Sequence, residues 1–321
     1  MKALRIIFMG TPEFAVASLD MLVQNNYNIV GVITVPDKPA GRGQQLQQSA
    51  VKKYAEEKGL RILQPEKLKA EQFINELRDL KADLQIVVAF RMLPEVVWNM
   101  PRLGTFNLHG SLLPAYRGAA PINWAVMNGD KETGVSTFFL QHEIDTGKII
   151  FREKTPIGEN ESAGEVHDRL MVIGASLVLK TVRAIENNDY PQVDQSVYIA
   201  KGEMEKHAPK IFKEDCRIVW TRPLKAVHDH VRGLSPYPAA FTEFISPDDK
   251  ANSVKVFATE KEPCIHNHPA GTIVTDSKSY LKVSVSDGYL IIKDLQLAGK
   301  KRLTVNEFLR GFPMTGGWKA L

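Results

Sequence analysis

Chemistry-bearing side chains gather in the segment Asn107–Pro114, which reads Asn-Leu-His-Gly-Ser-Leu-Leu-Pro and holds an amide, an imidazole and a sharp turn. The run Thr105–His109 predicts a strand, and because side chains alternate along a strand, Asn107 and His109 point to the same face. Both can donate hydrogen bonds to an oxygen that gains negative charge, as in acyl or formyl transfer. A single histidine near a strand end is more often structural, but the neighbouring amide favours a catalytic role.

A carboxylate follows in the segment Glu143–Gly147, where Asp145 precedes Thr-Gly. One interpretation is a turn aspartate that accepts hydrogen bonds from nearby backbone N–H groups. The other is a carboxylate close to His109, which would keep the imidazole protonated or accept a proton from an amine nucleophile. The sequence alone leaves both open.

The four residues Ser111, Leu112, Leu113 and Pro114 predict a tight apolar turn. Such a turn could line a slot for a flat aromatic ligand and expose backbone groups to it. The alternative is a plain connection to the next helix.

The loop Pro36–Gly43 contains two prolines, two glycines and the cations Lys38 and Arg42. It exceeds the usual length of a strand-to-helix connection, and it follows a strand whose carboxyl end should border the active-site crevice. The glycines would let a phosphate approach the backbone, although a plain surface loop is the alternative. Neither a dinucleotide-binding nor a Walker motif is present, which argues against a nicotinamide dehydrogenase or a P-loop nucleotidase.

The pattern of elements predicts two domains in these 321 residues. Residues 1–188 alternate apolar strands with amphipathic helices, which predicts an α/β fold with a doubly wound, mostly parallel sheet. Residues 189–206 are polar and non-periodic, as in an interdomain linker. Residues 207–321 hold one expected helix, 223–234, among five short strands, which favours a small OB-like β-barrel.

Charge is unevenly distributed, because residues 207–321 carry 17 Lys and Arg against 12 Asp and Glu. A basic third on a near-neutral body suggests a polyanionic partner, although a solvated surface explains the charge equally well. The candidate phosphate contacts are Lys206, Lys210, Lys300, Lys301 and Arg302.

Other features of the sequence indicate the environment in which we expect the protein to work. No apolar run reaches the roughly 18 residues of a membrane span, and the N-terminus reads as a first strand rather than a signal peptide. Cys216 and Cys264 lack metal-ligand spacing, which is typical of reduced cysteines in a cytoplasmic protein. The histidines form no convincing metal set, so we expect no catalytic metal.

Taken together, three segments resemble the core signature of the 10-formyltetrahydrofolate-dependent formyltransferases: Asn107–Pro114, Tyr116–Pro121 and Asp145–Gly147. The loop Pro36–Gly43 is similar to an insertion typical of the methionyl-tRNA formyltransferase branch. The resemblance covers nearly the whole chain. It implies a Rossmann-like formyltransferase domain followed by a barrel domain that holds tRNA.

The resemblance also implies roles for individual residues. The family's catalytic set corresponds to Asn107, His109 and Asp145, and its folate-binding turn to residues 111–114. The inserted loop, with Arg42 as its key cation, would enter the acceptor region of initiator methionyl-tRNA. The implied cosubstrate is 10-formyltetrahydrofolate, with no metal and no membrane partner, and we expect a monomeric cytoplasmic enzyme.

Two segments depart from the family pattern. Gln44 and Gln45 stand where relatives often carry lysine, and Ala89–Pro94 differs from the usual Tyr-Gly version and contains Arg91, which has no assigned role.

Two alternative functions also stay open. A formyltransferase for an amino sugar or purine precursor would need neither the loop nor the basic tail, and a non-catalytic tRNA-binding protein would not need the folate-type turn.

Overall fold

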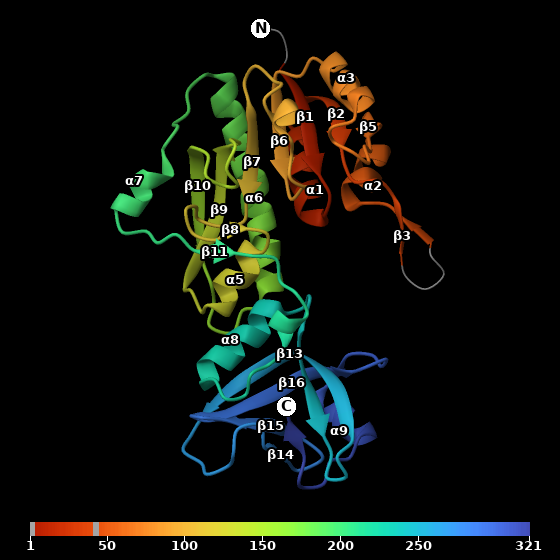
Figure 1. The fold of residues 1–321 in the computed structure, drawn as a ribbon, viewed down its shortest axis with the longest axis vertical. Helices are drawn as coiled ribbons and strands as arrows, with labels where there is room; N and C mark the ends of the chain where they lie inside the picture. Colours follow the sequence, from red (N-terminus) through yellow and green to blue (C-terminus); the bar gives the residue numbers. More distant parts are fainter. Residues whose placement is uncertain (1–3, 41–44) are drawn as a thin grey trace. The chain divides into compact units, whose positions relative to one another are not determined.

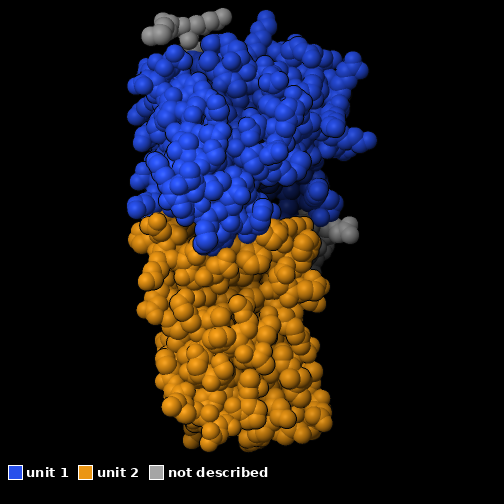
Figure 2. All heavy atoms as spheres, turned by 60° about the vertical axis from the view of Figure 1, so that its left-hand side comes forward, with its two compact units in different colours: residues 1–121, 134–155, 167–207 blue, residues 122–133, 156–166, 208–321 orange. Residues whose placement is uncertain are grey.

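The computed structural model describes residues 4–40 and 45–321, and the chain divides into two compact units (Figures 1 and 2). The first unit, blue in Figure 2, comprises Met1–Pro121, Gly134–Thr155 and His167–His207. The second, in orange, comprises Ile122–Thr133, Pro156–Val166 and Ala208–Leu321.

A seven-stranded sheet carries the first unit, and five of its strands run parallel, with β9 antiparallel to β7. The prediction of a doubly wound, mostly parallel sheet is therefore confirmed. In spatial order the strands are β10 (Ile149–Pro156), β9 (Glu132–Phe139), β7 (Thr105–His109), β6 (Leu84–Val88), β1 (Arg5–Gly10), β2 (Asn28–Ile33) and β5 (Ile62–Leu63).

Helices cover both faces of this sheet. On one face, Ile7 and Val87 pack in a single apolar cluster with Leu77 of α3. On the other, Gly174 of α6 lies against Leu108, where an added Cβ would come within 2.8 Å of the leucine side chain. The helices before residue 190 are α1 (Glu13–Gln24), α2 (Ala50–Glu57), α3 (Glu71–Asp79), α4 (Glu95–Trp98), α5 (Pro121–Met127) and α6 (Ala163–Glu186).

The described part of the expected loop Pro36–Gly43 contains a short strand. Strands β3 (Lys38–Ala40) and β4 (Gln45–Gln47) pair antiparallel, with Lys38 opposite Gln47. Strands of three residues are too short to show a periodic pattern, so they could not be predicted from the sequence. Arg42 and Gln44 lie outside the described residues.

The segment 189–206, expected to be non-periodic, contains a short helix, α7 (Gln195–Ala200). The Asp194 side chain caps it by accepting from the Ser196 N–H at 3.0 Å. Just before it, Val193 forms a β-bridge with Ile149 of β10. A helix of this length has no measurable periodicity, which is why the segment that contains it resembled a linker.

The second unit contains an antiparallel barrel. Its strands follow the order β14-β15-β16-β13-β12-β18, and a bridge between Thr272 and Lys319 joins the two ends. Closure removes exposed sheet edges, as expected for a small barrel. The strands are β12 (Ala240–Ile245), β13 (Ala251–Pro263), β14 (Ile273–Thr275), β15 (Leu281–Val285), β16 (Gly288–Leu297), β17 (Leu303–Thr304), which pairs with β16, and β18 (Lys319–Ala320).

The expectation of one helix in this region is wrong, because α9 (Val305–Gly311) accompanies α8 (Leu224–Leu234). Thr304 and Glu307 form a capping box at the start of α9, a signal that is readable from sequence. Short elements complete the chain, namely β8 (Arg117–Gly118), β11 (His207–Ala208) and the 3-10 turn η1 (Glu214–Cys216).

Among residues 4–40 and 45–321, none of the helices combines the length and hydropathy needed to cross a bilayer.

One histidine lies in the interior of the second unit. His228 of α8 is 1% exposed, and its Nδ1 lies 2.9 Å from the hydroxyl of Thr259. Burial, together with the nearby charges of Lys261 and Arg232, lowers the pKa of His228 from 6.5 to about 4. The imidazole is therefore neutral in the folded protein at neutral pH.

This burial predicts acid-sensitive stability. Below pH 6.5 an unfolded histidine gains a proton, whereas folded His228 stays neutral until about pH 4. The free energy of unfolding should therefore fall, by up to about 3 kcal/mol from this group, as the pH drops between those values. Urea unfolding of wild type and His228→Gln at several pH values measures the difference. A His142→Gln control should keep the wild-type pH dependence, and equal slopes for all three proteins would contradict the assignment.

Candidate active site

Asn107 and His109 end strand β7 and point to the same face of the sheet, the one that also carries Val87. The His109 ring is 6% exposed and packs edge-on against Phe138, with ring centroids 6.5 Å apart. Asn107 is half-buried, and within the described residues its side-chain amide makes no hydrogen bond. This amide is thus available to a bound molecule.

Two groups fix the imidazole of His109. Its Nε2 lies 2.8 Å from the backbone carbonyl of Tyr116, and because a carbonyl only accepts, Nε2 must carry a hydrogen. Its Nδ1 lies 3.9 Å from Oδ2 of Asp145. The ring therefore turns Nδ1 toward the carboxylate, and a proton on Nδ1 would complete an ion pair.

The structure brings the Asp145 carboxylate close to His109, which is the position that the second interpretation required. Its Oδ2 accepts a hydrogen bond of 3.0 Å from the backbone N–H of Gly118 and also faces His109. The N–H comes from a segment distant in sequence rather than from the local turn. Asp145 itself has a φ of +57°, in the left-handed region that aspartate tolerates better than most residues.

The predicted folate-binding turn is tightly fixed and largely buried. Ser111, Leu113 and Pro114 are buried, whereas Leu112 is half-buried. The hydroxyl of Ser136 donates to the carbonyl of Ser111 and accepts from the N–H of Leu113, at 2.7 and 3.0 Å. A ligand at this turn would therefore meet Leu112 and backbone groups.

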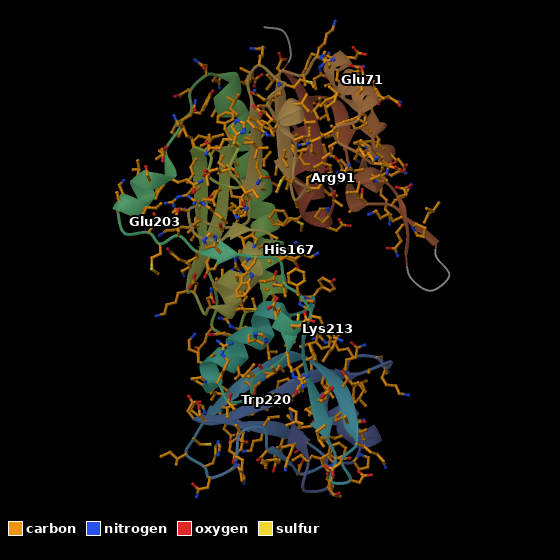
Figure 3. The ribbon with its side chains drawn as sticks, in the orientation of Figure 1. Glu71, Arg91, His167, Glu203, Lys213 and Trp220 are labelled. Carbon is orange, nitrogen blue, oxygen red and sulfur yellow. The ribbon has the colours of Figure 1, made fainter. Side chains whose placement is uncertain are left out.

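Several residues that support this site have no signature in the sequence. Arg152 of β10 donates to the carbonyl of Leu113 at 2.8 Å and pairs with Glu203, which follows α7 (Figure 3). Arg117 pairs with Glu205 at 2.5 Å and with the side chain of Gln195. These contacts join segments far apart in the chain, so no local pattern reveals them.

Arg91, which had no assigned role, fastens two loops together. Its guanidinium donates to the carbonyls of Glu66, at 2.9 Å, and of Pro65; Figure 3 labels Arg91. It therefore holds the segment after β6 against the segment after β5, at the carboxyl ends of two strands that β1 and β2 separate in the sheet.

The candidate tRNA-contacting cations of the first unit differ in their surroundings. Lys38 is exposed on β3, and Arg42 lies outside the described residues. Lys206 is half-buried, with its Nζ 3.3 Å from the hydroxyl of Tyr116 and 5.0 Å from the centre of that ring. Lys206 is thus attached to the residue whose carbonyl binds His109.

The candidate cations of the second unit also differ among themselves. Lys300 and Lys301 are exposed, and Lys210 lies 5.6 Å from the ring of Phe212. Arg302 is paired with Asp294 at 2.5 Å. Its positive charge is therefore balanced locally.

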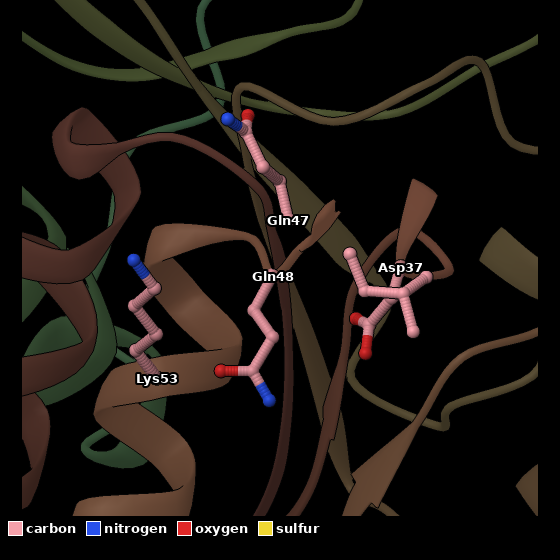
Figure 4. Close-up of a pocket in the computed structure, with 5 residues that line it drawn as sticks. Asp37, Gln47, Gln48 and Lys53 are labelled. Carbon is pink, nitrogen blue, oxygen red and sulfur yellow. The ribbon is translucent and has the colours of Figure 1, made fainter. Parts of the chain in front are cut away.

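A shallow hollow lies beside the β3–β4 hairpin, and Figure 4 shows its lining. Asp37 at its edge accepts from Lys52, at 2.5 Å, and from Gln64, at 2.8 Å, which fixes the start of the hairpin. The lining residues are Asp37, Leu46, Gln47, Gln48 and Lys53.

The part of the chain that the structure describes holds no group of three or more His, Cys, Asp or Glu placed to bind a metal.

Comparison with known proteins identifies relatives of the whole chain. Residues 4–182 match the family model Formyl transferase, and residues 210–313 match Formyl transferase, C-terminal domain. Methionyl-tRNA formyltransferase of Bacteroides thetaiotaomicron is 60% identical over 316 residues, covering 98% of each chain. The protein of the same name from Flavobacterium johnsoniae is 50% identical over 311 residues, covering 97% of each.

Solved structures share the fold at lower identity. WlaRD, a sugar 3N-formyl transferase, aligns with a TM-score of 0.64 at 20% identity, covering 94% of this chain and all of its own. HypX from Aquifex aeolicus in complex with tetrahydrofolic acid aligns with a TM-score of 0.66 at 17% identity, covering 98% of this chain and 49% of its own. The family expected from the Asn107–Pro114 signature is confirmed by the full-length relatives. The chain belongs to the formyl transferase family, in its methionyl-tRNA formyltransferase branch.

Proposed function

We propose that this protein transfers the formyl group of 10-formyltetrahydrofolate to the α-amino group of methionyl initiator tRNA, which yields N-formylmethionyl-tRNA. The observation that carries the proposal is the pairing of His109 with Asp145 at the end of β7, on the face of the strand that also carries Asn107, in a chain half or more identical to relatives of that name. These three groups suit an amine attacking a formyl carbon.

In this proposal, Asn107 and His109 stabilise the oxygen of the formyl group as it gains negative charge. The side-chain amide of Asn107 donates one hydrogen bond, and the protonated Nδ1 of His109 donates another. Asp145 orients the imidazole, because its carboxylate lies 3.9 Å from Nδ1. It also accepts, directly or through water, the proton that the amine releases as its bond to the formyl carbon forms; this proton passes to N10 of the folate as the bond between N10 and the formyl carbon breaks.

The remaining machinery binds and orients the two substrates. The turn at residues 111–114 would receive the folate ring through Leu112 and backbone groups, and the segment 36–43, with Lys38 and Arg42, would contact the tRNA acceptor arm. Because the amine and the formyl donor are held together, proximity supplies much of the rate. We further propose that the protein acts as a monomer in the cytoplasm.

A formylation assay tests the proposal. Purified protein with 10-formyltetrahydrofolate and charged initiator tRNA should yield formyl-methionyl-tRNA, and elongator methionyl-tRNA should react much more slowly. Turnover of a small amino sugar without any reaction on tRNA would instead support the sugar-modifying alternative. Binding of tRNA without transfer would support a non-catalytic protein.

Replacing His109 tests the catalytic assignment. His109→Ala removes a charged donor from the reacting oxygen, so kcat should fall by roughly 100-fold or more, equivalent to about 2.7–4 kcal/mol. The KM for tRNA should change by only a few-fold. His142→Ala is the control, since that side chain is 75% exposed and should leave the rate unchanged. A rate for His109→Ala within a few-fold of wild type would contradict the role.

The exposed lysines predict a salt effect. Joint replacement of Lys300 and Lys301 by alanine should flatten the dependence of log Kd for tRNA on log salt concentration by roughly 0.7–0.9 for each phosphate that is no longer neutralised. Arg302→Ala should have a smaller effect because Asp294 already neutralises it. Lys293→Ala is the control, because Lys293 pairs with Glu260. Fluorescence titrations at several salt concentrations measure the slope, and an unchanged slope in the double variant would rule out a phosphate-binding role for the two lysines.

A further inference from the structure

We propose that Gln195 is a positioning residue for formyl transfer, which holds the Asp145 turn so that its carboxylate reaches His109. The inference rests on the proposed function and adds a residue to it. Gln195 is the first residue of α7, in the segment whose sequence resembled a linker.

Every hydrogen-bonding position of this side-chain amide is occupied. Its Nε2 donates to the backbone carbonyls of Asp145, at 2.8 Å, and of Gly147, at 2.9 Å. Its Oε1 accepts from Nε and Nη2 of Arg117, at 3.1 and 2.7 Å. A primary amide has two N–H groups and two acceptor lone pairs, so these four bonds saturate it. Gln195 is 3% exposed, so none of these bonds competes with bulk water.

The hydrogen bonds of Gln195 connect the two segments that surround the Asp145 carboxylate. On one side is the turn that carries Asp145. On the other is Arg117, whose neighbour Gly118 donates its N–H to the Asp145 carboxylate at 3.0 Å. One side chain thus fixes both the backbone that bears the carboxylate and the segment that donates to it.

The Asp145 turn needs such support. Asp145 has a φ of +57°, a conformation that costs energy for residues other than glycine. At Gly147 a side chain is impossible, since a Cβ would lie 1.7 Å from the carbonyl oxygen of Phe139. Without the Gln195 amide, two carbonyls of this turn would lose their donor, and a buried unpaired carbonyl is unfavourable.

The residues just before Gln195 fix the start of α7. Val193 and Ile149 exchange backbone hydrogen bonds of 2.9 and 2.8 Å, and Asp194 caps α7. A displacement of about 1 Å at a reacting group can cost on the order of 100-fold in rate. Because Gln195 is anchored, it can fix the position of the Asp145 turn. That position sets the distance between the Asp145 carboxylate and the His109 ring.

The matched substitution is Gln195→Glu, which keeps the shape and the acceptor for Arg117 but removes the donor to both carbonyls. We expect kcat for formylation to fall by about 10- to 100-fold, while the KM values for tRNA and folate change less than about threefold. Gln141→Glu is the control. It makes the same change on an exposed residue near the same turn, where the amide donates only to Thr146, and it should behave as wild type.

A double-mutant cycle separates positioning from general destabilisation. If Gln195 acts through Asp145, then Gln195→Glu should cost much less in an Asp145→Asn background than in wild type. Gln195→Met, which fills the space without a charge or a donor, should also lower kcat and guards against misfolding of the glutamate variant. Circular dichroism at the assay temperature checks that each variant is folded.

If the wild-type protein is active, any one of three results would overturn the inference. They are kcat within twofold of wild type for a folded Gln195 variant, an equal cost in both backgrounds, or a change confined to KM. An inactive wild-type protein would instead refute the proposed function, so the two failures are distinguishable.

Discussion

The site depends on a carboxylate that comes from one turn and an imidazole that comes from the end of a different strand. Oδ2 of Asp145 lies 3.9 Å from Nδ1 of His109, and the backbone N–H of Gly118 donates to the same oxygen. The Tyr116 carbonyl then selects the ring orientation by accepting from Nε2. Residues 116–118 therefore contact both members of the pair and help to position them.

A second layer of residues fixes those that face the site. Arg152 holds the Leu113 carbonyl and is paired with Glu203, and Arg117 is held by Gln195 and Glu205. All three partners come from residues 193–206. This segment thus belongs to the catalytic unit by its contacts, although its composition is that of a connector.

The second unit is built on different principles. Its barrel closes through the bridge between Thr272 and Lys319, and apolar side chains fill its interior. Charged groups on its surface are partly cancelled by neighbours, as Arg302 is by Asp294. Lys300 and Lys301 retain exposed charge, so they are better candidates for phosphate contact than the third cation of the cluster.

The parallel sheet, the barrel strands, the family and the shared face of Asn107 and His109 could all be predicted from the amino-acid sequence. These features rest on short-range periodicity and on a contiguous motif, which the chain carries locally. The approach of Asp145, the hairpin at Lys38 and the contacts of Gln195 emerge only in the folded chain. Each of these depends on hydrogen bonds between segments separated by tens of residues, or on elements too short for a periodic pattern. The groups that form these hydrogen bonds become neighbours only when the chain folds. Packing, and not local propensity, then determines which backbone carbonyls need a donor.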